Sequence, residues 1–197
     1  AECDGTGNLT AYNAWLDNNG GAVASDDCGP VTWTKVPNFA PGCGATGVYT
    51  VEFTATDENG LSVSSTGTFT IVDTTDPVFV GDLPSDATAE CDAVPEAVTL
   101  TATDNCGTAS VAYSQTRTDG DCLNSYILTR TWVATDLCGN MTTHVQKITV
   151  VDTTNPTFVG DLPSDATADH QALPSAPTRP SSDLCGTASV AYSQTRA

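Results

Sequence analysis

The sequence has little positive charge, and this scarcity limits its partners. Six Lys and Arg stand against 24 Asp and Glu, which gives a formal net charge of −18 at pH 7. A nucleic-acid-binding protein needs basic side chains to neutralise phosphates, so this composition excludes nucleic acid as a partner. No apolar run is long enough to cross a bilayer, so we expect no direct membrane insertion. The acidic excess suits an elongated protein whose negative charges repel one another and which binds divalent cations.

Catalytic motifs are also missing. The chain has only two His, and it contains no metalloprotease helix motif, phosphate-binding loop or nucleophile elbow. His144 lies in an expected strand, and His170 lies in an atypical segment of the sequence. We therefore expect that the protein is not an enzyme and that it has no catalytic residue.

Residues that favour long helices are scarce, whereas turn-forming residues are common. The chain has one Met but 16 Gly and 11 Pro, together with many Thr and Ser. β-branched residues fit a pleated sheet, and Gly and Pro interrupt strands at turns. This balance predicts an all-β protein.

The eight cysteines lack the spacing of a zinc site. No C-x-x-C pair occurs, and most of the cysteines lie beside Asp and Gly in turn-like sequence. Cysteines in such contexts are typical of disulfides, which persist in oxidising compartments. We therefore expect an extracellular protein at a cell surface.

Internal repetition is the main organising feature of the chain. Residues 72–77 recur at 151–156 with an offset of 79 residues, 81–89 recur unchanged at 160–168, and 106–117 recur unchanged at 185–196. An earlier copy, in the first part of the chain, matches these repeated segments more loosely. This pattern predicts a first repeat at 1–73 without its first strand, a complete second repeat at 74–152 and a partial third repeat at 153–197.

The repeat length and its strand pattern predict the fold. A unit of about 79 residues suits one small Ig-like β-sandwich. Apolar residues alternate in the first repeat at Tyr49, Val51, Phe53 and Ala55, as expected for a strand with one buried face. An insertion at 10–18, followed by Gly, predicts one short helix. The predicted fold class is therefore tandem Ig-like β-sandwiches with a single helix.

Disulfide pairing cannot be read from the sequence alone, because four cysteines allow three pairings. In an Ig-like sandwich the B–C and F–G turns lie at one end and the A–B and E–F connections at the other. This topology favours one disulfide at each end of a repeat. In the second repeat we predict the pairs Cys91–Cys122 and Cys106–Cys138.

The first repeat carries three cysteines, and its counterpart of Cys138 is Asn59. We predict a Cys3–Cys43 disulfide that leaves Cys28 free. A Cys28–Cys43 disulfide with a free Cys3 is the open alternative.

Several motifs together resemble one family. The opening D-T-T-x-P, the turn at 104–107 (DNCG) and the segment at 134–140 (ATDLCGN) resemble hyalin-repeat (HYR-like) domains over essentially the whole chain. The resemblance is greatest to the Cys-rich versions in giant surface proteins of Bacteroidetes-type bacteria, including gliding-motility adhesins. It implies an Ig-like fold, secretion, and a role in adhesion or in spacing a binding tip away from the cell.

Acidic and amide side chains at the border of the first two repeats suggest a calcium site. The linker at 73–77 is similar to the acidic linkers of cadherin repeats, and Ca²⁺ binds carboxylate, amide and carbonyl oxygens. Asp and Asn in such turns also hydrogen-bond their own backbone, so plain turns are the alternative. The linker at 152–156 has one charge fewer, and we expect weaker binding there. The candidate ligands are Asp73, Asp76, Asp104, Asn105, Asp136 and Asn140.

Two functions fit these features. The first is a disulfide-bonded stalk in a long surface adhesin or filament, whose partners are neighbouring repeats of the same chain or filament. The second is an adhesion module that binds surface glycans or proteins, for which an exposed Trp15 in the predicted helix is the candidate ligand-binding residue. Near-identical copies favour the stalk, because a specific site needs only one copy.

One segment departs sharply from the repeat. Between the unchanged blocks that end at 168 and begin at 185, the third repeat differs from the second and places Pro177 and Pro180 in an expected strand, where each would remove a ladder donor. The segment resembles translated sequencing-adapter sequence. We interpret 170–184 as a sequence-assembly artefact, which would also account for the partial terminal repeats. Natural divergence is the alternative.

Overall fold

The chain folds into β-sheets with one short helix, as the composition predicts. The computed structural model describes residues 1–121, 124–161, 167 and 180–193. Its contacts divide the chain into two compact units, one of residues 1–83, 99–113 and 132–144 and the other of 84–98, 114–131 and 145–197. The sheets are open and mostly antiparallel, and the prediction of an all-β chain with one short helix is confirmed.

The first repeat contains a three-stranded antiparallel sheet in the order β1-β2-β3. The strands are β1 (Thr32–Pro41), β2 (Gly47–Thr56) and β3 (Ser62–Ile71). The register of β2 places Val51, Phe53 and Ala55 on one face, and all three side chains are buried. The alternation seen in the sequence therefore marks the buried face correctly.

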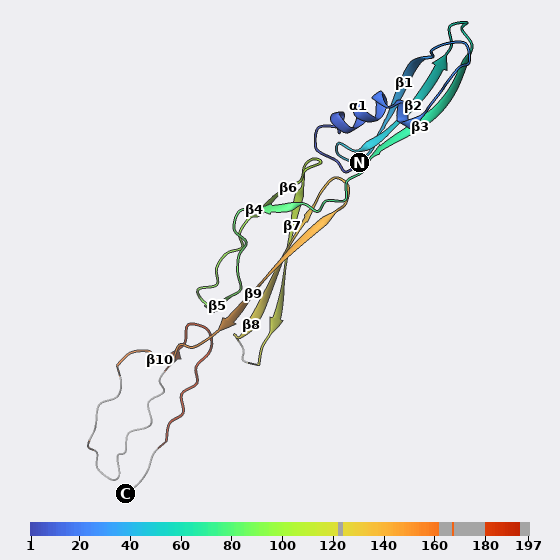
Figure 1. The fold of residues 1–197 in the computed structure, drawn as a ribbon. Coiled ribbons are helices and arrows are strands. Elements are labelled where there is room, and N and C mark those ends of the chain that lie inside the picture. Colours follow the sequence, from blue (N-terminus) through green and yellow to red (C-terminus); the bar gives the residue numbers. More distant parts are fainter. Residues whose placement is uncertain (122–123, 162–166, 168–179, 194–197) are drawn as a thin grey trace. The chain divides into compact units, whose positions relative to one another are not determined.

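A helix covers this buried face in the first compact unit (Figure 1). Helix α1 (Leu9–Asp17) has Asn18 as its C-cap and is followed by a short 3₁₀ turn at Asn19–Gly21, in which Gly20 has a φ of 64°, a conformation that favours glycine. The Lys35 ammonium donates a hydrogen bond to the carbonyl of Leu16 near the end of the helix. The predicted helix at 10–18 is thus present.

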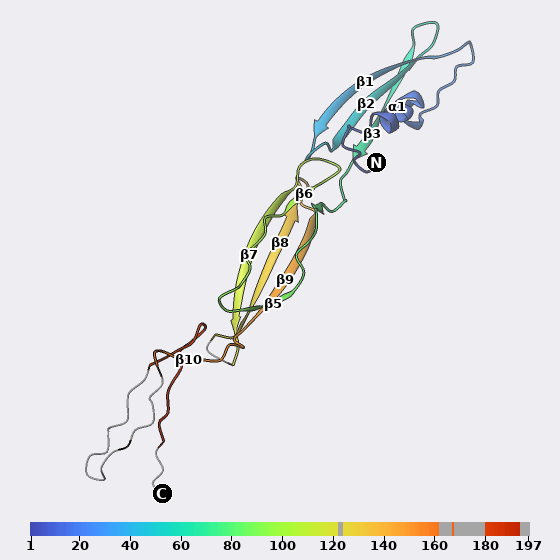
Figure 2. The ribbon, with the colours of Figure 1, turned by 90° about the vertical axis from the view of Figure 1, so that its left-hand side faces the viewer.

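The strands of the second repeat form two sheets. One has the order β5-β9-β8-β7, with β5 parallel to β9, and β4 pairs antiparallel with β6 in the other. Figure 2 shows β7, β8 and β9 side by side. The strands are β4 (Val78–Val80), β5 (Ala87–Glu90), β6 (Thr101–Thr103), β7 (Ser110–Asp119), β8 (Tyr126–Thr135) and β9 (Met141–Val151).

Strand β8 carries a buried charge that the sequence left unexplained. Arg130 is 4% exposed, and its guanidinium donates hydrogen bonds to the side-chain oxygen of Gln115 and to the carbonyls of Pro95 and Glu96. A buried cation is tolerated when its donors are satisfied. The chain before β6 supplies the two carbonyl acceptors, so Arg130 ties an irregular segment to the sheet.

The third repeat is described only in part. Strand β10 (Thr157–Phe158) pairs antiparallel with β11 (Ser181–Ser182). Most of the segment that we interpret as an artefact, including His170, lies outside the described residues. The predicted repeat borders stay a prediction.

Candidate functional site: the repeat junctions

The three disulfides between described residues join cysteines that the sequence assigns to different repeats, and the predicted pairing within repeats is wrong. Cys3 pairs with Cys106 at a Cα–Cα distance of 5.6 Å, and Cys43 pairs with Cys138 at 5.1 Å. Both distances suit a disulfide. Cys106 and Cys138 therefore bond to the preceding repeat and not to each other, and Cys3 does not bond to Cys43.

Backbone contacts around Cys3 explain why it pairs with Cys106 and not with Cys43. Glu2 forms a parallel bridge with Val72, and the Cys3 N–H donates to the Val72 carbonyl over 2.8 Å. These contacts hold Cys3 at the end of β3, where the first repeat passes into the second. The Ala45 N–H donates to the Cys106 carbonyl, which brings the turn at 104–107 to the same place.

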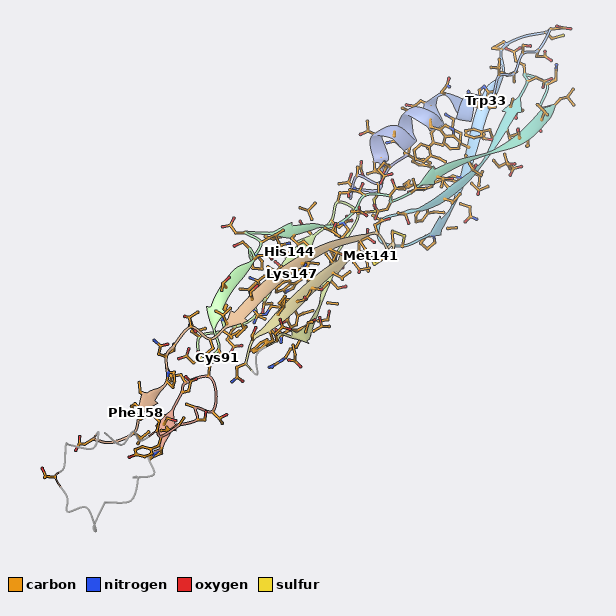
Figure 3. The ribbon with its side chains drawn as sticks, turned by 90° about the horizontal axis from the view of Figure 1, so that it is seen from below. Trp33, Cys91, Met141, His144, Lys147 and Phe158 are labelled. Atoms are coloured by element: carbon orange, nitrogen blue, oxygen red, sulfur yellow. A yellow bond between two sulfur atoms is a disulfide. The ribbon has the colours of Figure 1, made fainter. Side chains whose placement is uncertain are left out.

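A third disulfide repeats this arrangement in the second compact unit. Cys91 pairs with Cys185, and Figure 3 labels Cys91. Cys185 lies 79 residues after Cys106 and is its counterpart. Cys91 is the counterpart of Cys3 once the insertion in the first repeat is allowed for. One pairing rule therefore applies twice, and it joins consecutive repeats. The predicted Cys91–Cys122 pair is wrong; Cys122 itself lies outside the described residues.

We call the residues around Asp73 and Asp152 the first and second junctions. Each junction lies within one compact unit. At the first junction, Asp73, Asp104 and Asp136 each offer a carboxylate oxygen, and these oxygens lie within 4.8 Å of one another. Two oxygens bound to one Ca²⁺ at about 2.4 Å can be at most about 4.8 Å apart. Three of the six predicted calcium ligands are thus close enough to share an ion.

Asp104 has one oxygen in use and one without a partner. Its Oδ1 accepts a hydrogen bond from the Cys106 N–H over 2.7 Å, which forms the expected turn. Its Oδ2 is buried and has no hydrogen-bond partner among the described residues. A buried carboxylate oxygen without a donor is costly unless a cation or water satisfies it. The donor set fits a hard cation such as Ca²⁺.

The charges at the first junction repel each other. Burial raises the pKa of the Asp73 carboxyl above its usual value, and the charges of Asp104, Asp136 and Glu2 raise it further, against a hydrogen bond from the Thr75 N–H. A bound cation would remove this repulsion. The electrostatics therefore favour a cation at the place where the carboxylates converge.

Asp136 and Asn140 form the best-connected part of the site. Asp136 Oδ1 accepts the backbone N–H groups of Cys138, Gly139 and Asn140, and Oδ2 accepts the Asn140 amide at 2.8 Å. Burial acts to raise the pKa of Asp136, but these hydrogen bonds lower it below its usual value. The Asn140 amide also donates to the Asp73 carbonyl over 3.2 Å. This turn thereby fastens the second repeat to the linker.

Two predicted ligands lie elsewhere. Asp76 is exposed and is not in this group of carboxylates. The Asn105 amide donates to the Cys3 carbonyl over 2.6 Å, so it fastens the junction.

Glu2 is a junction residue that the sequence reasoning missed. Its carboxylate accepts the Thr74 N–H over 2.7 Å and the hydroxyl groups of Thr74 and Thr75. The hydrogen bond from the Thr74 backbone is the largest influence on its pKa, which is lowered. A Glu precedes the cysteine in both Glu2-Cys3 and Glu90-Cys91, and this recurrence was the available signal.

The second junction repeats these contacts in its own compact unit. Glu90 accepts hydrogen bonds from the N–H and the hydroxyl of Thr153, and the Cys185 N–H donates to Asp183. Glu90, Asp152 and Cys185 also lie close together, but the Cys185 sulfur is committed to its disulfide. Among the described residues this junction has fewer carboxylates available for an ion.

Trp15 packs against the sheet. It is half-buried, and its ring lies 5.4 Å from the ring of Phe53 and 5.7 Å from that of Phe69. Trp33, labelled in Figure 3, packs against the same cluster. Glycan stacking requires an exposed ring, whereas this packing covers part of the Trp15 ring. The packing therefore does not favour Trp15 as a glycan-binding residue.

Cys28 has an exposed and free thiol, as predicted, although the Cys3–Cys43 disulfide that was predicted with it is wrong. No helix in the described part of the chain is long and apolar enough to cross a membrane.

No protein-family model and no curated protein matches the chain. Among solved structures, it is similar to one described as the protocadherin gammaB7 EC3-6 cis-dimer, at 16% sequence identity and a TM-score of 0.28. That match covers 70% of this chain and 46% of the other chain, so this chain spans less than half the length of that structure.

Proposed function

We propose that the chain is a non-catalytic stalk segment of a long extracellular adhesin or filament, in which disulfides lock each repeat to the next. The observation that carries this proposal is the pairing of Cys3 with Cys106, Cys43 with Cys138, and Cys91 with Cys185. A disulfide within a repeat stabilises that repeat alone. A disulfide between repeats also limits how far tension can separate them, which suits a structural element under load.

Pulling the chain by its ends tests this function. Tension would pass from Ala1 to Cys3, across to Cys106, back to Cys91, across to Cys185 and on to Ala197. This path has about 30 residue steps and extends to roughly 100 Å, against roughly 650–700 Å for the reduced chain. Single-molecule force spectroscopy with and without a reductant measures both lengths.

Disulfides within repeats would give a different result. With Cys3–Cys43, Cys91–Cys122 and Cys106–Cys138 bonds, the path would have about 120 residue steps and extend to roughly 400 Å. An oxidised length near that value, or one that does not change on reduction, would remove the basis of the stalk proposal.

We further propose that Ca²⁺ binds at the first junction through Asp73, Asp104 and Asp136. The support is the convergence of their oxygens within 4.8 Å, together with the unpartnered Asp104 Oδ2. A bound ion would fix the linker to the turns that precede Cys106 and follow β8, and so stiffen the joint. We expect millimolar Ca²⁺ to raise the melting temperature above that in chelator. An unchanged melting temperature would indicate plain hydrogen-bonded turns.

A further inference from the structure

The two disulfides of the first junction differ in burial. Cys3 and Cys106 are 4% and 2% exposed, and they lie in a hydrophobic cluster with Ile71. Cys43 is exposed and Cys138 is half-buried. A thiol in solution must reach a sulfur before it can break the S–S bond. Of the two bonds, Cys43–Cys138 offers this access and Cys3–Cys106 does not.

Burial also protects the Cys3–Cys106 bond by its effect on the leaving sulfur. Exchange expels one sulfur as a thiolate, and apolar surroundings disfavour that charge. Phe69 packs against the cluster that contains Cys3 and Cys106, so a thiolate released there would be removed from water. A thiolate from the Cys43–Cys138 bond would instead form at the surface.

The loop that carries Cys43 has contacts that do not depend on its disulfide. The Ala45 N–H donates to the Cys106 carbonyl over 3.1 Å. Gly44 has a φ of 57° and lies so near this carbonyl that a Cβ at position 44 would be 2.5 Å from the oxygen. These contacts hold the loop against the turn at 104–107, which the buried disulfide fixes in place. The exposed bond can therefore open while the junction stays folded.

We propose that Cys43–Cys138 is a site of reversible thiol–disulfide exchange with small thiols, and that Cys3–Cys106 is the permanent link beside it. The role of this site rests on the stalk function proposed above. A joint that is fixed at two points resists bending more than a joint fixed at one. Reduction of the exposed bond thus makes the joint easier to bend, while the buried bond still limits its extension.

Exchange at this site takes two balanced steps. The thiolate of the reagent attacks the exposed Cys43 sulfur, the bond to Cys138 breaks, and the Cys138 sulfur leaves as a thiolate that takes up a proton from water. A second thiolate attacks the reagent sulfur of the mixed disulfide and releases the Cys43 thiolate. Two reagent thiols are thereby oxidised to one disulfide, and that disulfide can restore the protein bond by the reverse reaction.

The charge around the site selects among small thiols. Asp136 lies two residues before Cys138 and accepts its N–H over 2.8 Å. Carboxylate oxygens of Asp73 and Asp104 lie within 4.8 Å of one of Asp136. These charges repel an anionic reagent. The site therefore favours thiols that carry an amine, such as cysteamine, over glutathione with its two carboxylates.

Timed alkylation of the intact chain tests the proposal. The oxidised chain is kept in chelator, so that the proposed calcium site stays empty, and samples are alkylated and mapped at intervals after cysteamine is added. We expect Cys43 and Cys138 to become alkylated at least about tenfold faster than Cys3 and Cys106. Cys28 is free and exposed, and its alkylation from the start gives the reference for complete reaction. Equal rates for the two bonds would overturn the proposal.

A pair of variants tests whether burial is the cause of the difference. Phe69→Ala should speed reduction of the Cys3–Cys106 bond, because it opens the cluster around these sulfurs. Phe39→Ala is the matched control, since Phe39 is 43% exposed and outside that cluster, and it should leave the rate unchanged. The same effect in both variants would contradict protection by burial.

Comparison of two thiols tests the selection by charge. At equal thiolate concentration, cysteamine should reduce the Cys43–Cys138 bond several-fold faster than glutathione, and the difference should shrink at high salt. Equal rates at low salt would contradict this selection.

Force spectroscopy separates this site from the stalk function on which it rests. A chain in which only Cys43 and Cys138 are alkylated should still extend to roughly 100 Å, because the shortest covalent path runs through Cys3–Cys106. A longer extension would overturn the permanent link. A peptide map of the oxidised chain without bonds between repeats would instead remove the stalk function itself.

Discussion

At the scale of single residues, the carboxylates of Asp136 and Asp73 at the first junction have opposite effects on the stability of the folded chain. Asp136 is stabilised in its charged form by hydrogen bonds, and its pKa is lowered. Asp73 is destabilised by burial and by neighbouring charges, and its pKa is raised. Because the folded-state pKa of Asp73 is raised, its ionisation opposes folding, and this cost appears as pH rises through that pKa. Without a cation, Asp73 therefore weakens the structure at neutral pH.

This asymmetry gives a prediction for Asp73→Asn. In chelator at neutral pH, the variant should melt at a higher temperature than the parent chain, because the unfavourable charge is gone. In Ca²⁺ it should show little or no further stabilisation, because a ligand is lost. Calorimetry with and without Ca²⁺ measures both effects.

Asp76→Asn is the matched control, since Asp76 is exposed and outside the carboxylate group. It should keep the calcium response of the parent chain. An equal loss of response in both variants would indicate general charge screening in place of a site.

At the scale of elements, helix α1 forms the second layer of the first repeat. Tyr12 is buried, and Trp15 and Leu16 pack with it on the sheet residues Val51 and Phe53. A short helix is marginal by itself in water, so packing on the sheet must hold it. The insertion that lengthens the first repeat therefore contributes to the hydrophobic core.

This packing predicts that Trp15→Ala destabilises the chain. Loss of a half-buried indole should lower the free energy of unfolding by roughly 2–3 kcal/mol, somewhat less than for a fully buried Trp. Leu9→Ala in the same helix is the control, because Leu9 is 55% exposed and should cost well under 1 kcal/mol. Urea denaturation gives both values; a neutral Trp15→Ala would return Trp15 to the role of a surface ligand-binding residue.

At the scale of the whole molecule, the disulfides act over long stretches of chain. Cys3 and Cys106 are 103 residues apart, and Cys43 and Cys138 are 95 apart. In the chain-entropy description, closing a loop of this length stabilises the folded state by about 4–5 kcal/mol. Small sandwiches have limited cores, so this contribution is a large part of their stability.

Removal of one long-range disulfide should show this directly. We expect the double variant Cys3→Ser with Cys106→Ser to lose about 4–5 kcal/mol of unfolding free energy. Cys28→Ser should leave stability unchanged, because Cys28 is free and exposed. Chemical denaturation under oxidising conditions compares the three chains, and a loss below about 1 kcal/mol would contradict a major role for the link between repeats.

Much of the molecule was determined by local sequence. The alternation at 49–55, the Gly after the helix and the Asp-x-Cys-Gly turns each depend on neighbours within a few residues. The strands, the helix and the turns at Asp104 and Asp136 were therefore predictable. The predicted Ig-like topology also placed Asp104 and Asp136 at the end of the repeat that faces Asp73, and the structure brings the oxygens of these three residues together.

Only the tertiary structure decided which cysteines meet and what covers each buried face. Sequence spacing does not show that Cys3 lies beside Cys106, because that proximity depends on Glu2 pairing with Val72 at the end of β3. Likewise, two of the three hydrogen-bond acceptors of Arg130, the carbonyls of Pro95 and Glu96, come from a segment more than thirty residues away in the chain. Such contacts form between distant segments, and the sequence near each residue carries no information about which distant segment it meets.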